Sequence, residues 1–272
     1  MSTKGQSSLK EVLQSAFAGS VIVICFIIAV IVYLKVFGNP NNFEGFNPKG
    51  HPIEGNYLGI IYKGGPIVPI LITVNLVLIV FVIERLITLA RAKGRGRIPA
   101  FVRKIQALLQ ENKIEDAIVA CDKQKGSLAN VVRSGMKRYR DLQSDKTLPN
   151  DQKVIALQKD LEEATALELP MLSKNLVILS TVASISVLIG LIGTVLGMIR
   201  AFAALATAGS PDALALATGI SEALVNTAFG ITGSTLAIVF YNFFSNKIDQ
   251  MTYKIDEVNF SVTQTFAESL GK

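Results

Sequence analysis

The sequence predicts an all-α integral membrane protein with four transmembrane helices and a helical cytoplasmic domain between spans two and three. Of its 272 residues, 50% are hydrophobic and only 18% are charged, and the mean hydropathy is +0.44. Soluble domains are ordinarily less apolar and more charged. Long stretches of the chain carry no charge at all, and the basic residues gather in one of the loops between them. These observations together favour a multi-pass membrane protein.

The transmembrane helices are predicted from the uncharged stretches. There are four of them, Val12–Leu34, Gly64–Ile83, Asn175–Ile199 and Ala223–Asn246. Each matches the roughly 20 residues that cross about 30 Å of hydrocarbon as a helix.

The first stretch has a second interpretation, a cleaved signal peptide whose basic segment holds Lys4 and Lys10. Its apolar run is longer than the roughly 7–15 residues of a signal-peptide core, and no small-residue cleavage sequence follows Leu34. We therefore expect a retained anchor. Because Cys25 lies in this span and Cys121 in the cytoplasmic loop, both cysteines are expected to remain free thiols.

Orientation follows from the basic residues. The loop from Ala90 to Lys174 holds most of them, whereas the loop from Gly38 to Lys63 has two and the loop from Ala201 to Ser221 has none. Basic loops stay on the cytoplasmic side. The long loop and both termini are thus expected in the cytoplasm, with the chain in the cytoplasmic (inner) membrane. The net charge of +6 then needs no nucleic acid to explain it, and membrane lipids are the expected surroundings.

The expected organisation has six segments. They are an extra N-terminal transmembrane helix (1–37), a periplasmic loop (38–65), transmembrane helix two (66–88), a cytoplasmic helical region (89–172), transmembrane helices three and four as the core (173–246) and a cytoplasmic C-terminal tail (247–272). The periplasmic loop is rich in Gly, Pro and Asn and is expected to be irregular.

Periodicity predicts helices in the cytoplasmic region. Apolar residues recur at helical spacing on both sides of Asn112, which indicates a helical hairpin that breaks there. A third helix is expected over Leu128–Leu142, a loop over Gln143–Asn150 and a further helix from Asp151. The adjacent pair Glu84 and Arg85 is expected to mark the water boundary, with Arg85 reaching toward lipid headgroups.

Spans three and four carry an unusual set of small and polar residues. In span three the stripe is Ser186, Gly190, Gly193, Gly197 and Arg200, bordered by Thr194. In span four it is Glu222, Asn226, Gly230, Gly233 and Ala237, bordered by Thr227 and Ser234. Small residues at such spacing let helix backbones approach closely, and hydroxyls can bond across the contact. The two helices should run antiparallel, with Arg200 and Glu222 near the outer end and both threonines deeper.

Two interpretations of this set remain open. The glycines fit ordinary helix packing, and Glu222 could sit in interfacial water or pair with Arg200. A membrane carboxylate followed by Asn226 and Thr227 also supplies proton donors and acceptors along one path. The sequence holds no nucleophile–base set, phosphate-binding loop or metal cluster, so we expect no enzyme, metal or cofactor.

Three motifs carry a family resemblance. Gly190–Phe202 has the sequence GLIGTVLGMIRAF, Ser221–Gly230 has SEALVNTAFG, and Tyr241 and Asn242 follow. In this order they resemble the MotA/TolQ/ExbB proton-channel family, and most of all its ExbB branch. The resemblance extends from about Pro66 to the end of the chain.

The resemblance implies a function and a set of partners. It implies a pentamer around the single helices of two ExbD-like subunits, with protons from the periplasm driving motion that a TonB-like protein passes to outer-membrane transporters. Thr194, Glu222 and Thr227 match the family's proton-pathway and pore-lining residues, while the proton-accepting aspartate belongs to the ExbD-like partner.

The chain departs from the family pattern in two places. Val187 stands where a proline is common, and the extra first span has no counterpart. The alternatives are a TolQ-like subunit for envelope maintenance, a flagellar stator and a non-conducting membrane scaffold. A solute transporter is disfavoured because no inverted repeat with paired broken helices is evident.

Overall fold

The computed structural model describes residues 19–48, 50–206 and 213–270, apart from the side chain of Leu214. Within these residues every element is helical, and a single isolated bridge joins Phe43 and Pro52. Four helical segments are long and apolar enough to cross a membrane: Gly19–Phe37, Gly65–Ala92, Asn150–Ala206 and Ala215–Leu270. The predicted class, an all-α membrane protein, is confirmed. The start of span one and residues 207–212 lie outside the described residues.

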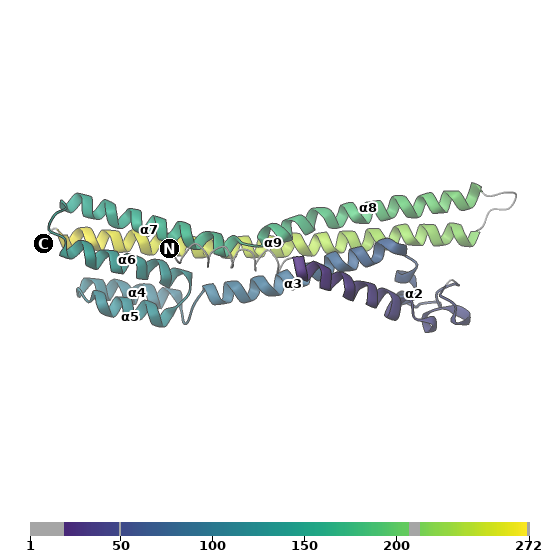
Figure 1. Ribbon diagram of the computed structural model, residues 1–272, viewed down its shortest axis with the longest axis horizontal. Coiled ribbons are helices and arrows are strands. Elements are labelled where there is room, and N and C mark those ends of the chain that lie inside the picture. The colour runs from purple at the N-terminus through teal and green to yellow at the C-terminus, as the bar shows by residue number, and fades with distance from the viewer. Residues whose placement is uncertain (1–18, 49, 207–212, 271–272) are drawn as a thin grey trace, which may run out of the picture. The chain divides into compact units, whose positions relative to one another are not determined.

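The chain forms two compact units. The first comprises Met1–Ile83 and Val177–Tyr241, and the second comprises Glu84–Leu176 and Asn242–Lys272. Two helices, α3 (Val68–Ala92) and α9 (Ala213–Leu270), contribute residues to both units, whereas α8 (Leu176–Ala206) belongs almost wholly to the first (Figure 1). Each unit is described separately below.

In the first unit, the loop between the first two spans is more ordered than its composition predicts. Short helices occupy it and its borders: η1 (Tyr33–Phe37), η2 (Pro40–Asn42), η3 (Glu44–Phe46), α2 (Tyr57–Tyr62) and η4 (Gly65–Ile67). Asn42 Nδ2 donates to the carbonyl oxygens of Val36 and Phe37 at 2.8 and 3.0 Å. The ring of Tyr33 stacks on Tyr62, with centroids 4.8 Å apart. Side-chain amides and paired aromatic rings therefore hold this segment against the end of span one.

The first span contacts the rest of its unit along a narrow strip. Ala29 packs with Val68 and Ile72 of α3 in a small buried cluster. Only 17% of the apolar stretch of this span is buried, against 56% of the corresponding stretch of Gly65–Ala92. The remaining surface of the first span is available to lipid or to another protein.

The second unit is a helical bundle. Its helices are α4 (Ile98–Gln110), α5 (Ile114–Gln124), α6 (Ser127–Ser144), α7 (Asn150–Ser173) and the later part of α9. The predicted hairpin, its break at Asn112 and the two following helices are confirmed within two residues. Asn112 takes a left-handed conformation, φ 56°, which ends the first helix of the hairpin.

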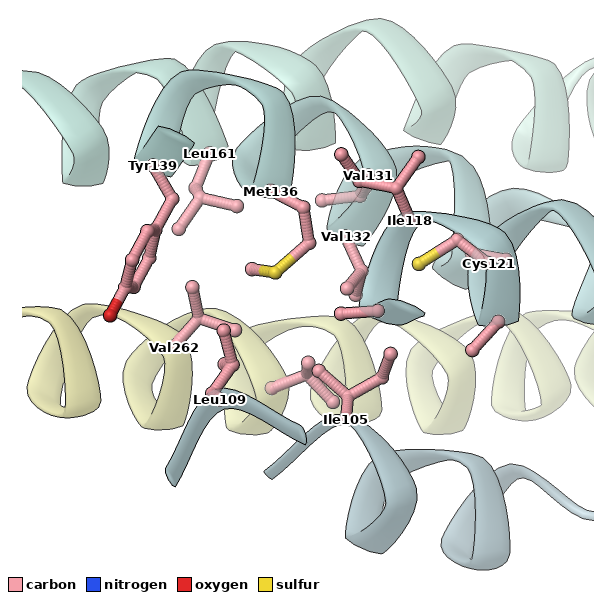
Figure 2. Packing of buried hydrophobic residues seen from close by; sticks show 14 of the residues in the cluster. Ile105, Leu109, Ile118, Cys121, Val131, Val132, Met136, Tyr139, Leu161 and Val262 are labelled. Carbon is pink, nitrogen blue, oxygen red and sulfur yellow. The ribbon is translucent and has the colours of Figure 1, made fainter. Parts of the chain in front are cut away.

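Residues from five helices share the core of this bundle. Figure 2 shows Met136 of α6 among Ile105, Leu109 and Val262, which come from α4 and α9. The last helix contributes Ile255, Val258, Val262 and Phe266, all at most 1% exposed. Their steps of three and four residues are the helical pattern that marks a buried face. The tail expected as a separate segment is thus a structural part of the bundle.

Cys121 lies in this core and is expected to resist alkylation. Its side chain is 2% exposed, and burial, with the Asp122 carboxylate as a lesser cause, raises the pKa of the thiol from 9.0 to about 12. The thiolate fraction at neutral pH is therefore about a thousandfold below that of a free cysteine. Because the folded-state pKa is the higher one, this group lowers stability as pH rises above 9.0.

Maleimide labelling of a Cys25→Ala chain tests this expectation. We expect negligible reaction at pH 7.5 in the folded protein and full reaction after denaturation. Rapid labelling of the folded protein would contradict the buried position of the thiol.

Candidate functional site

The site is built on the close contact of α8 with α9 in the first unit. A Cβ atom added at Gly230 would lie 2.8 Å from the carbonyl oxygen of Ser186, and one added at Gly190 would lie 3.1 Å from that of Asn226. A Cβ added at Gly197 would lie 2.7 Å from backbone atoms of Gly219 and Ala223. One added at Gly193 would lie 2.5 Å from the Asn226 side chain. The four predicted packing glycines thus all lie in this contact, where side chains would force the helices apart.

Two threonine hydroxyls meet beside these glycines. Thr194 Oγ1 and Thr227 Oγ1 are in direct hydrogen-bond contact across the two helices. Each also lies 3.1 Å from a carbonyl oxygen one turn earlier in its own helix, that of Gly190 or Ala223. The two hydroxyls have two protons for three possible hydrogen bonds: the one between them and one from each to its own helix. The pair can therefore form its hydrogen bonds in more than one arrangement. Both side chains are partly exposed and can therefore also bond a group outside the subunit.

Glu222 forms an ion pair with Arg200 nearer the end of α8 and the start of α9. Arg200 Nη1 donates to both carboxylate oxygens, at 2.5 and 2.6 Å. The Glu222 side chain is only 4% exposed, whereas that of Arg200 is 52% exposed. The sequence left two surroundings open for Glu222, interfacial water or an ion pair with Arg200. The structure shows the ion pair.

The turn before α3 closes over this carboxylate. Gly65 has φ +77°, and a Cβ there would lie 2.2 Å from Glu222 Oε1. Asn226 is fully buried, and its Nδ2 donates to the carbonyl oxygen of Gly64 at 2.9 Å. Its Oδ1 is buried with no hydrogen-bond partner among the described residues. This clamp from residues 64 and 65 was not predicted, although the Gly-Gly-Pro sequence there is a recognisable turn signal.

A second polar cluster lies deeper between α3, α8 and α9. Ser186 is fully buried, and its Oγ has no partner within the described part of the chain. A Cβ at Gly233 would lie 2.5 Å from that oxygen and 2.9 Å from Asn75 Oδ1. Asn75, from α3, is a further polar residue that the sequence analysis did not single out.

A cavity of about 500 Å³ opens beside the ion pair. Its lining includes Tyr62, Lys63 and Thr218 together with Arg200 and Glu222. Partial burial lowers the pKa of the Lys63 ammonium. The polar lining gives water a route to the ion pair from one side of the unit.

The other predicted boundary pair lies in the second unit. Arg85 donates to both oxygens of Glu84 at 2.6 Å and through Nη1 to the Leu172 carbonyl oxygen at 3.1 Å. Its side chain is 2% exposed, so the expectation that it reaches toward lipid headgroups is wrong. The reason is that Leu172 lies in the last turn of α7, where carbonyl oxygens lack partners within the helix.

Removal of Arg200 is expected to destabilise the chain more than neutralisation of Glu222. Arg200→Ala leaves a buried carboxylate without its cation, which costs about 3 kcal/mol or more. Glu222→Gln leaves a half-exposed arginine that water can solvate. Thermal unfolding of both variants and of the double variant measures the difference, and the double variant should be more stable than Arg200→Ala alone. Equal melting temperatures for the two single variants would contradict this assignment.

Residues 123–257 match the MotA/TolQ/ExbB proton channel family. The chain is a member of that family. The match includes Thr194, Arg200, Glu222 and Thr227, and it confirms the resemblance drawn from the motifs. Among the described residues of this family member, no group of His, Cys, Asp or Glu could hold a metal ion.

Curated relatives carry both ExbB and TolQ names. The Tol-Pal system protein TolQ of Pseudomonas aeruginosa is 31% identical over 121 residues, which are 44% of this chain and 52% of the relative. The putative biopolymer transport protein ExbB-like 3 of Synechocystis is 38% identical over 86 residues, 31% and 41% of the two chains. The biopolymer transport protein ExbB of Salmonella typhimurium is 35% identical over 80 residues, 29% and 33%. The chain spans about a third to a half of the length of these relatives.

Proposed function

We propose that this chain is a non-enzymatic, cofactor-free subunit of an ExbB- or TolQ-type motor driven by protons across the inner membrane. The observation that carries the proposal is the hydroxyl contact between Thr194 and Thr227. These side chains lie on the two helices covered by the family match, and the Arg200–Glu222 pair lies farther along the same helices.

The hydroxyls suit a carboxylate that gains and loses a proton. Each can donate to a carboxylate and accept from a carboxylic acid, so both protonation states find partners. The uncharged stretches of spans two to four contain no acid, which supports a titrating carboxylate supplied by a partner. About 2.3 kcal/mol is available per charge per 100 mV of membrane potential, enough to bias a two-state motion.

The assembly that fits this chemistry is a pentamer of this chain around the single helices of an ExbD-like partner. The partly exposed threonines then face a shared lumen, and the termini lie in the cytoplasm. Force passes to a TonB-like protein that energises transport across the outer membrane, as expected from the relatives named for biopolymer transport. A TolQ-like role in envelope maintenance is the second candidate, favoured by the Tol-Pal relative with its longer match of 121 residues.

Proton flux into liposomes tests the proposal. The chain is reconstituted with an ExbD-like, acid-bearing, single-span protein, and a pH-sensitive dye reports flux under a potassium diffusion potential. Flux is expected only when both proteins are present. Absence of flux from the assembled complex would favour the non-conducting scaffold.

Deletion in the source organism separates the two roles. An ExbB-like subunit is expected to be needed for uptake of ligands that enter through outer-membrane transporters. A TolQ-like subunit is expected instead to be needed for resistance to detergent.

A further inference from the structure

The second unit contains an apolar groove with a basic rim. The groove has a volume of about 300 Å³ and lies between the end of α3, the start of α4 and the α9 segment that follows Asn242. Leu86, Leu89 and Phe243 contribute to its apolar wall, and the cationic residues are Lys93, Lys247 and Lys254. No carboxylate lines it.

The groove lies where the hydrophobic spans give way to charged sequence. The uncharged stretch of span two ends at Ile83, and that of span four ends at Asn246, directly before Lys247. Leu86 and Phe243 remain 47% and 50% exposed. Such apolar exposure next to lysines is typical of a helix surface at the level of lipid headgroups.

The three groove lysines lack an anionic partner in the part of the chain that the structure describes. Within the described residues none of the three forms an ion pair. Lys247 and Lys254 are seven residues apart on α9 and therefore share a face, while Lys93 approaches from the end of α3. Asp249 is two residues from Lys247 and lies on a different face.

We propose that this groove is a binding site for one anionic phospholipid. The lysines contact its phosphate, and the apolar wall contacts the start of an acyl chain. Charge complementarity favours an anionic headgroup over a zwitterionic one, because three lysines line the groove and none of its described lining residues carries a carboxylate. The apolar wall favours a lipid over a free anion, which would leave that surface uncovered. The site does not depend on proton conduction.

Native mass spectrometry of the full-length chain tests the site. The delipidated protein is titrated with phosphatidylglycerol, with phosphatidylcholine of the same acyl chains and with inorganic phosphate. Tight binding is expected only for phosphatidylglycerol. The variant Lys93→Gln/Lys247→Gln/Lys254→Gln should bind it about 100-fold more weakly, because each lysine near an anionic headgroup is worth about fivefold.

Two matched variants make the result specific. Lys123→Gln/Lys137→Gln/Lys159→Gln removes the same charge from exposed positions elsewhere in the bundle and should bind normally. Replacing the three groove lysines by arginine should also preserve binding. Several results would overturn the proposal: equal affinity for both lipids, equal weakening by the control triple variant, competition by phosphate alone, or cross-linking of the groove to a second copy of the chain.

Discussion

Replacing Thr194 or Thr227 by valine is expected to abolish proton-driven activity while the subunit still folds and assembles. Valine has nearly the shape of threonine, so the packing of α8 against α9 is kept. The Thr194–Thr227 hydroxyl pair is lost. With it go the hydrogen bonds that both protonation states of the proposed partner carboxylate require. An unpaired charged group in a low-dielectric site costs about 1–3 kcal/mol or more. We expect energised uptake to fall by at least about tenfold and in the double variant to background.

The measurement is ligand uptake at native expression, with oligomer formation followed by chemical cross-linking. Thr181→Val is the matched control, because Thr181 lies on the same helix and donates to a carbonyl oxygen of its own helix, Val177, at 2.8 Å. It should retain full uptake. Normal uptake in either Thr194→Val or Thr227→Val would remove the hydroxyl pair from the mechanism.

Gly230→Val is expected to cause a large loss of stability in the first unit. The new Cβ would lie 2.8 Å from the Ser186 carbonyl oxygen and 2.9 Å from the Gly190 Cα atom, both of them backbone atoms that cannot rotate away. Separation of the helices costs about 3 kcal/mol or more and also separates Thr194 from Thr227. A markedly lower melting temperature and loss of uptake should therefore appear together.

Gly19→Val is the control for this prediction, because nothing lies within 4 Å of a Cβ at Gly19. Its melting temperature should stay close to that of the unchanged protein. If Gly230→Val melted at the same temperature as the control, the close approach of α8 and α9 would be wrong.

Local sequence patterns accounted for most of the fold. Uncharged stretches located the four spans, and apolar periodicity located the bundle helices, because both depend on residues close together in the chain. The stripes of small and polar residues in spans three and four predicted that the glycines and threonines lie on facing helices, because such stripes also depend on residues close together in the chain. The pairing of Arg200 with Glu222 was one of two possibilities that the sequence left open.

Contacts that depend on distant segments could not be predicted in this way. Asn226 bonds Gly64, and Arg85 bonds Leu172, across 162 and 87 residues. Both depend on how α3 approaches other helices, which periodicity within one helix does not specify. The packing of the tail helix differs from these contacts, because its apolar steps from Ile255 to Phe266 follow a local helical pattern that is present in the sequence.

Water accessibility at positions 194 and 227 shows whether the two threonines face an aqueous lumen. Thr194→Cys and Thr227→Cys are introduced separately into a chain with Cys25→Ala and Cys121→Ala, and Val195→Cys serves as an apolar control that is 59% exposed. The chains are labelled in native membranes with a charged methanethiosulfonate, which reacts only where water reaches the thiol. The account predicts labelling at positions 194 and 227 and little at 195. Unreactive cysteines at both threonine positions would place them against lipid and contradict it.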